Sequence, residues 1–215
     1  MITEVDVGDV EYHRRAIKGM ITAQKQRDPS FTVIDVGGSM DGWSTDCVDA
    51  IMDFNKPDVA TSVHVFVANL NKQNDWQEIL DYVAKNGKFS YVICSHTLED
   101  IANPTLTMDM LPHIATAGYI AVPSKYIELA KIEGNYRGFI HHRWIFDFQN
   151  GKFIGFPKLP FIEYETHLHK LADTSPELGE LCFCWKDSFQ YEIINNDYMG
   201  PSIDHVHEYY ERLLQ

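Results

Sequence analysis

The sequence predicts an α/β protein built on an open, mostly parallel sheet that is flanked by helices. Short, almost continuous apolar runs such as "FTVIDV" (residues 31–36) are typical of strands buried on both faces of a parallel sheet. Segments with helical spacing alternate with such runs between residues 31 and 125. This alternation indicates strand, helix, strand units, and these units place helices on both faces of one sheet.

The first predicted element is a helix over residues 10–27, in which Ile17 and Ile21 lie four positions apart on one face. Asp28 and Pro29 end it, because proline cannot continue a helix. Apolar runs then predict five strands, of which the second can also be the end of a short helix: residues 31–36, 47–54, 62–70, 89–95 and 118–124.

Two helices are expected between the later strands. Residues 75–88 carry an apolar stripe that begins at Trp76. Asp75 is placed to cap the start of this helix, and Gly87 is placed to end it. The segment "PTLTMDMLPHI" (residues 104–114) is expected to form the other helix.

The last third of the chain has a different pattern. Residues 143–158 form two apolar runs around Asn150-Gly151, a strong hairpin signal. A second antiparallel pair is expected from residues 179–187 and 188–195, and a closing helix from residues 204–214. No repeat or linker divides the chain, so the sequence predicts a single domain over residues 1–215, in which the hairpins extend or cap the same sheet: a core over about 31–125 and a hairpin and cap region over about 126–215.

Composition excludes several classes of protein. The formal net charge of −13 opposes a nucleic-acid partner, because that affinity comes mainly from Lys and Arg. No apolar run approaches the roughly 20 residues that span a bilayer, and no secretory signal opens the sequence, so we expect a cytoplasmic protein without a membrane partner. The four cysteines predict neither a disulfide framework nor a zinc framework, and Cys182 and Cys184 fall on one face of a strand.

Ligands bind beyond the carboxyl ends of the strands in open parallel sheets, so the residues that follow each strand are the candidates for a site. The first such segment contains glycine, and Asp53 follows the second strand. The fourth segment, "SHTLED", is dense in hydrogen-bonding groups. The candidate segments are residues 35–42, 53, 69–71, 95–100 and 123–125.

The segments "VIDVGG", "DGW", "FSYVICSHTLEDIANP" and "GYIAVPS", between Val33 and Ser124, resemble the class I S-adenosylmethionine-dependent methyltransferases, in particular their small-molecule branch. The segment "YRGFIHHRWIFD" resembles an uncharacterised subgroup that pairs "HTLED" with "HHRW". This resemblance implies a Rossmann-like sheet and S-adenosylmethionine as cofactor. It also implies methyl transfer to an oxygen or nitrogen of a small polar acceptor, such as a sugar or another metabolite.

The resemblance also implies roles for individual residues. The loop at Gly37 and Gly38 bends under the methionine part of the cofactor, and Asp53, with Asp49 as the alternate, holds the ribose hydroxyls. Asn69 and Leu70 contact the adenine. The full set predicted to bind cofactor is Asp35, Gly37, Gly38, Ser39, Asp41, Gly42, Trp43, Asp53, Asn69, Leu70, Ser95 and His96.

The first loop departs from the family pattern, which would place glycine at positions 39 and 41. The chain has Ser39 and Asp41 there, with Gly42 one position late. Too few residues separate Gly42 from the next strand for a full helix, so the loop needs fewer glycines for close packing. Asp41 is predicted to face the ammonium group of the cofactor. The alternative is an ordinary strand and turn without a ligand.

His96 is the first candidate for the base that removes a proton from the acceptor, since its ordinary pKa lies near 6.5. Asp100, His141 and His142 are the further catalytic candidates. The alternative for "SHTLED" is a helix start, capped by Ser95 or Thr97.

The "HHRW" segment leaves a metal-dependent reading open. His141 or His142 can reach the "SHTLED" segment as an acid–base partner or as part of a metal site, although no metal ligand is assigned. The pairs His167/His169 and His205/His207 have no third ligand nearby in the sequence and are expected at the solvated surface.

Tyr136 and Arg137 form either a lid over an anionic substrate group or a plain surface loop. The sequence leaves two rival functions open, a non-catalytic binding protein on the same fold and a metal-dependent enzyme. It also leaves the oligomeric state open.

Overall fold

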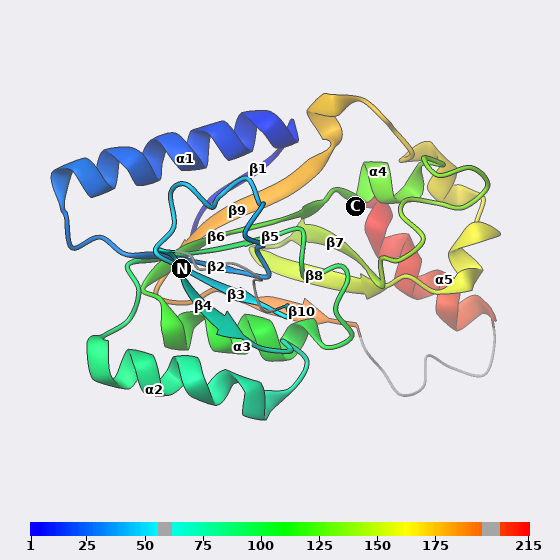
Figure 1. Cartoon of the computed structure of the whole chain (residues 1–215). Helices are drawn as coiled ribbons and strands as arrows, with labels where there is room; N and C mark the ends of the chain where they lie inside the picture. The colour runs from blue at the N-terminus through cyan, green and yellow to red at the C-terminus, as the bar shows by residue number, and fades with distance from the viewer. Residues whose placement is uncertain (56–61, 195–202) are drawn as a thin grey trace.

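The computed structural model describes residues 1–55, 62–194 and 203–215 (Figure 1). Within these residues, seven strands form the main sheet in the order β1-β9-β6-β5-β2-β3-β4. The strands are β1 (Ile2–Gly8), β2 (Val33–Val36), β3 (Ala50–Asp53), β4 (His64–Val67), β5 (Tyr91–Ser95), β6 (Ala117–Pro123) and β9 (Glu180–Lys186).

The five strands from β4 to β6 pair in parallel, whereas β9 is antiparallel to both of its neighbours, β6 and β1. Counted along the chain from β2, the parallel strands follow the order 3-2-1-4-5, which is the order of a doubly wound sheet. The predicted Rossmann-like fold class is therefore confirmed. The order reverses between β2 and β5, so this is the point where such sheets bind ligands.

Helices cover both faces of the main sheet (Figure 1). On one face, Ile17 and Ile21 of α1 (Val10–Arg27) pack with Val33 and Ile51 of the sheet. On the opposite face, α2 (Gln77–Asn86) and α3 (Pro104–Ile114) contribute to the largest apolar cluster. None of the described helices is long and apolar enough to span a membrane.

The predicted hairpin is confirmed as β7 (Trp144–Gln149) and β8 (Lys152–Pro157). Asn150 and Gly151 both have positive φ, of 51° and 79°, as a two-residue hairpin turn of type I′ requires. The hairpin does not extend the main sheet, however. It forms a separate three-stranded sheet with β10 (Tyr191–Ile193). This small sheet packs against α4 (Lys125–Leu129) and α5 (Ile203–Glu211).

The second predicted hairpin is wrong. Strand β9 lies between β1 and β6 in the main sheet, while β10 pairs in parallel with β8. Most residues of β9 are buried, as expected of a strand with neighbours on both edges. The two strands follow one another in the sequence, but each finds its apolar partners in a different sheet.

The structure differs from the sequence analysis at two further places, an edge strand and the start of α2. Strand β1 has no counterpart in the sequence analysis, because it is an edge strand whose residues 3–6 are exposed and mostly polar. Asp75 does not cap α2, since its carboxylate accepts a hydrogen bond of 2.9 Å from the backbone N–H of Asn69. A short 3-10 turn, Gln73–Trp76, precedes α2 instead.

Candidate functional site

A cavity of about 370 Å³ opens at the carboxyl ends of β2, β3, β4 and β5, where the strand order reverses. Its volume lies within the roughly 300–1,000 Å³ of ordinary small-molecule sites. Sequence reasoning missed several lining residues, among them the exposed Phe54 and the buried Met52. The residues predicted as site residues that do line the cavity are Gly37, Asp53, Asn69, Leu70, His96 and Asp100.

The glycine pair at the end of β2 is required by close contacts. Gly37 has φ of +84°, and a Cβ at this position would lie 2.3 Å from the side chain of Thr97. A Cβ on Gly38 would lie 2.3 Å from the carboxylate of Asp35. The backbone therefore passes directly over Thr97 and Asp35, and only residues without a side chain fit there.

Asp35 lies beneath this loop and outside the cavity lining. Its buried carboxylate accepts a hydrogen bond from the Ser44 hydroxyl. Burial raises the pKa of Asp35 to about 7, with a smaller contribution from Asp53, while the hydrogen bond from Ser44 opposes the rise. The structure thus places Asp35 as a support for the glycine loop.

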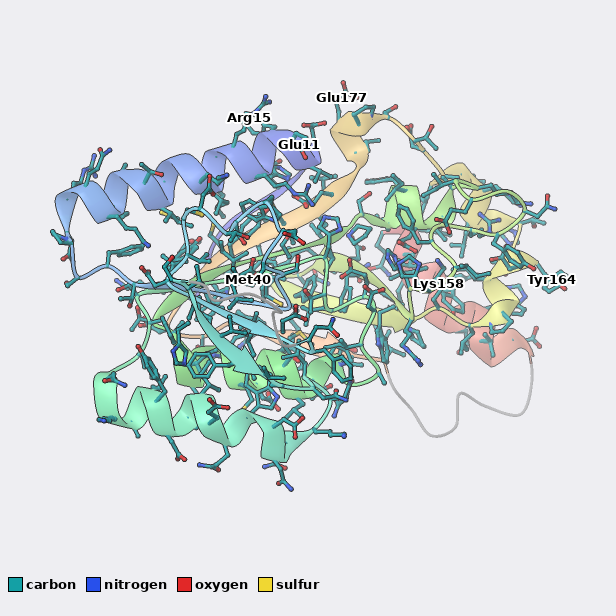
Figure 2. All side chains as sticks on the ribbon, in the orientation of Figure 1. Glu11, Arg15, Met40, Lys158, Tyr164 and Glu177 are labelled. Carbon is teal, nitrogen blue, oxygen red and sulfur yellow. The ribbon has the colours of Figure 1, made fainter. Side chains whose placement is uncertain are left out.

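The rest of the loop folds toward α1. Gly42 donates its backbone N–H to the carbonyl of Ser39 at 2.9 Å, which closes a turn. Trp43 packs with the apolar cluster under α1, and so does Met40 (Figure 2), whereas Asp41 is exposed. The residues of the predicted cofactor set that do not line the cavity are Asp35, Gly38, Ser39, Asp41, Gly42, Trp43 and Ser95.

The two alternative ribose-binding acids lie at opposite ends of β3. Asp53 ends the strand and lines the cavity. Asp49 precedes the strand, accepts a hydrogen bond of 2.7 Å from the backbone N–H of Val33 and forms an ion pair with Lys25. Of the two acids, only Asp53 lines this cavity.

His96 lines the cavity from an unusual backbone conformation, with φ of 51°. Its Nε2 lies 2.7 Å from Glu180 and its Nδ1 lies 3.5 Å from Glu99. Burial lowers the pKa of His96, but the hydrogen bond with Glu180 and the nearby negative charge of Glu99 outweigh this effect and raise the pKa to about 9. The fold therefore favours the cationic form of His96, held between two carboxylates.

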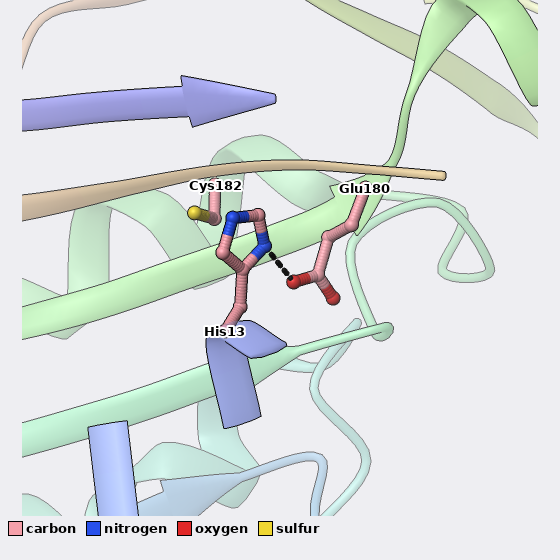
Figure 3. A group of neighbouring side chains, drawn as sticks. All are labelled: His13, Glu180 and Cys182. Carbon is pink, nitrogen blue, oxygen red and sulfur yellow. Dashed lines mark hydrogen bonds and ion pairs between the residues drawn. The ribbon is translucent and has the colours of Figure 1, made fainter. Parts of the chain in front are cut away.

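Glu180 was missed by sequence reasoning, because it opens an apolar strand with no motif around it. Its buried carboxylate also accepts hydrogen bonds from Tyr119 at 3.0 Å and from His13 Nδ1 at 2.7 Å. Figure 3 shows His13 beside Glu180 and Cys182. The carboxylate thus joins a histidine of α1 to a histidine of the cavity.

This network predicts a pH dependence of stability. The neighbouring Cys182 and Glu180 side chains raise the pKa of His13 from 6.5 to about 11, against the effect of burial. With both histidine pKa values raised, the folded state retains protons that the unfolded state loses. This stabilisation is complete below about pH 6.5 and is lost as the pH rises through 9 and then 11.

Urea unfolding of the wild type between pH 7 and pH 9.5 is therefore expected to show a falling free energy of unfolding. Glu180→Gln removes the negative charge that favours both protonated histidines, so its free energy of unfolding is expected to fall less steeply over this interval. Equal slopes for the two proteins would contradict the network.

A second group lies at the rim of the cavity, where "HHRW" meets "SHTLED". Nε2 of His141 lies 3.7 Å and Nε2 of His142 lies 3.6 Å from Oδ1 of Asp100. The carbonyl of Glu99 fixes the two segments together, since it accepts a 2.7 Å hydrogen bond from the backbone N–H of Arg143. The structure thus brings three of the predicted catalytic residues together and leaves His96 with Glu180.

A second carboxylate contacts the His142 ring at Nδ1, the nitrogen that does not face Asp100. Its Nδ1 lies 2.5 Å from the buried carboxylate of Glu128, which also forms an ion pair of 2.7 Å with Lys158. This contact fixes the orientation of the ring, so that Nε2 faces Asp100. Neither Glu128 nor Lys158 was predicted, because they come from α4 and from the residue after β8.

Arg137 is neither an exposed lid residue nor part of a plain surface loop, although it lines a second cavity together with His142. This side chain is buried, and its guanidinium donates hydrogen bonds to the carbonyls of Leu129 and Glu165 at 2.7 and 3.1 Å. Burial lowers the pKa of Arg137, although Glu163 and Glu165 favour its charge. The arginine holds the cap region together.

His167 and His169 are exposed, as predicted, and the side chain of His205 lies outside the described residues. A shared partner nevertheless links one histidine of each pair. His167 lies 2.9 Å and His207 lies 2.5 Å from the buried carboxylate of Glu165. His167 is in a 3-10 turn and His207 is in α5, so the tertiary fold supplies a shared partner that sequence proximity did not show.

Neither a protein-family model nor a curated protein matches the sequence. Among solved structures, the chain is similar to the N-terminal domain of EvdMO1 with SAH bound, with a TM-score of 0.42, 11% identity, and coverage of 79% of this chain and 80% of that chain. A cyclopropane-fatty-acyl-phospholipid synthase-like protein from Lactobacillus casei has a TM-score of 0.39 and 12% identity, over 85% of this chain and 96% of that chain. The methyltransferase domain of bacterial CtHen1-CN has a TM-score of 0.37 and 11% identity, over 79% of this chain and 97% of that chain.

Proposed function

We propose that this chain binds S-adenosylmethionine in the cavity at the ends of β2 to β5 and transfers its methyl group to a small polar acceptor. One observation carries this proposal. A glycine turn, an acid and an amide, which follow three neighbouring strands, line one cavity at the point where the strand order reverses.

The residues of the cavity suit this cofactor. The glycine turn lets the ligand approach the backbone closely at Gly37. Asp53 is half-buried, and a carboxylate there can accept hydrogen bonds from two hydroxyl groups. Leu70 and the exposed Phe54 supply apolar surface for a flat ring.

S-adenosylmethionine supplies a methyl group that is already activated by its bond to a positively charged sulfur. In the transfer, the acceptor atom forms a bond to the methyl carbon while the bond from carbon to sulfur breaks, and its electron pair stays on sulfur. The protein must align the acceptor with the methyl group and remove the acceptor's proton.

We assign the activation of the acceptor for loss of this proton to the group formed by Asp100, His141 and His142. His96 is held as a cation between Glu180 and Glu99, so it has no free lone pair. His142 presents Nε2 toward Asp100, and Asp100 lines the cavity. The same histidine lines a second cavity of about 210 Å³, which offers room for an acceptor beside the cofactor cavity. The net charge of −13 favours a small molecule over a nucleic acid as that acceptor.

Isothermal titration with S-adenosylmethionine and S-adenosylhomocysteine tests the proposal. We expect both to bind with one site per chain. An absence of binding at millimolar concentrations would contradict the proposed function. Binding without methyl transfer to any of a panel of sugars and other small alcohols and amines would favour the non-catalytic binding protein instead.

A further inference from the structure

We infer that Asp100, His141 and His142 form a binding site for one divalent transition-metal ion, which holds the hydroxyl group of the acceptor at the rim of the cofactor cavity. The role toward the acceptor rests on the proposed function, whereas the metal site itself does not. Two imidazoles and one carboxylate are ligands that suit Zn²⁺, Fe²⁺ and similar ions better than Mg²⁺ or Ca²⁺.

The spacing of the three side chains carries the inference. One ligand atom from each lies within 4.8 Å of the other two, and the distances from Asp100 to the two histidines are 3.6 and 3.7 Å. These distances are too long for hydrogen bonds. Ligand atoms about 2.1 Å from a shared tetrahedral ion lie roughly 3.4 Å apart, so only small shifts would complete the site.

The described part of the chain contains two other groups of residues that could bind a metal ion, but their side chains lie close enough to contact one another directly. His13 lies 2.7 Å from Glu180 and 3.2 Å from Asp6, so both of its ring nitrogens already have partners. In the third group, His167 and His207 lie 2.9 and 2.5 Å from Glu165. Direct contacts of 2.5–3.2 Å between histidine and carboxylate explain these two groups without an ion, whereas the histidines of the group at Asp100 lie farther from its carboxylate.

The residues behind the ligands support the same inference. Histidines that bind metal usually donate their other ring N–H to a carboxylate, and Glu128 takes this position behind His142. Glu99, next to Asp100, has a carboxylate that is 1% exposed and has no hydrogen-bond partner among the described residues. Its one ion pair in the described part is the 3.5 Å contact with His96, so negative charge beside the site is incompletely compensated.

The position of the site indicates what the ion does. Asp100 lines the cofactor cavity, His142 lines the second cavity, and 3.6 Å separates the two side chains. The side chain of His141 is 61% exposed and that of Asp100 is 43% exposed, so coordination positions on this side remain open to a ligand. An acceptor hydroxyl bound there would lose its proton to water more easily, because a bound metal ion lowers the pKa of a coordinated oxygen. This favours an oxygen acceptor over a nitrogen acceptor.

Isothermal titration of the tag-free, chelator-treated chain with Zn²⁺, in the absence of S-adenosylmethionine, tests the site. We expect one ion per chain. Asp100→Asn and His141→Ala each remove one ligand from an exposed position and are expected to weaken binding at least about 10-fold, while Glu128→Gln is expected to weaken it roughly 10- to 100-fold. His167→Ala, in the group at Glu165, is the matched control and is expected to leave the affinity unchanged.

Two outcomes would overturn the inference. One is no Zn²⁺ binding by the wild type, in which case His142 acts with Glu128 as a metal-free base. The other is binding that survives both Asp100→Asn and His141→Ala, which would place the ion elsewhere. Thermal unfolding of each variant verifies its fold. A chain that binds Zn²⁺ but not S-adenosylmethionine would contradict only the proposed function, and the reverse result would contradict only the metal site.

Discussion

Replacing Asp53 by alanine is expected to weaken the binding of S-adenosylmethionine by roughly 100-fold. In the proposed complex, the Asp53 carboxylate accepts hydrogen bonds from two ribose hydroxyls at the end of β3. A hydrogen bond to a charged group contributes about 1.5–3 kcal/mol, and each 1.4 kcal/mol corresponds to a tenfold change in affinity. Isothermal titration of the variant and the wild type measures the loss.

Asp49→Asn is the matched control, since Asp49 lies at the other end of the same strand. It removes a charge that pairs with Lys25 and so is expected to lower stability without changing cofactor affinity. If Asp49→Asn weakened the cofactor affinity and Asp53→Ala did not, that result would contradict the proposed contact between the ribose and Asp53. Thermal unfolding of Asp53→Ala should remain close to that of the wild type, because Asp53 has no ion pair in the described part of the chain.

Gly37→Ala is expected to destabilise the protein by about 3 kcal/mol. An alanine at this position must keep the left-handed backbone conformation of Gly37, which costs a residue with a Cβ roughly 1–2 kcal/mol. Its Cβ would also lie 2.3 Å from the side chain of Thr97. Overpacking of a filled site costs about 1–3 kcal/mol more. The free energy of unfolding in urea measures the sum, and cofactor affinity should fall with it because the loop must move.

Gly134→Ala separates the two costs. Gly134 has φ of +83°, almost the same as Gly37, but a Cβ there meets no atom within 4 Å. Its loss of stability is expected to be about 1 kcal/mol, which is the backbone cost alone. Equal losses for the two variants would mean that contact with Thr97 does not constrain the loop.

The local sequence pattern was sufficient to locate much of the cavity at the ends of β2 to β5. Gly37, Asp53 and Asn69 each follow a short apolar strand, and parallel strands bring their carboxyl ends to one edge of the sheet. Asp41 and Trp43, which belong to the same predicted set, do not line this cavity. The loop that carries them turns toward α1 after Gly38, where Trp43 gains apolar contacts and lies near Arg14. Those contacts lie outside the local sequence.

The charged partners of the site histidines could not be predicted from the local sequence either. Glu180 reaches His96 from a strand 84 positions away, and Glu128 reaches His142 from α4. These partners orient both histidine rings, and they favour the cationic form of His96. His96 was the first candidate base by sequence, and its ion pair with Glu180 is the reason that we propose the group at Asp100 instead.

The sequence by itself determined the class of fold and the position of the cavity, because buried parallel strands form short continuous apolar runs and amphipathic helices have a period of about 3.6 residues. It also determined the hairpin at Asn150-Gly151, whose turn needs residues that tolerate positive φ. Only the tertiary structure decided that β9 joins the main sheet between β1 and β6, that β10 joins the small one, and that Asp100 meets His141 and His142. These arrangements depend on contacts between distant segments, and in them the free energy is set by shared burial and charge rather than by any local preference of the chain.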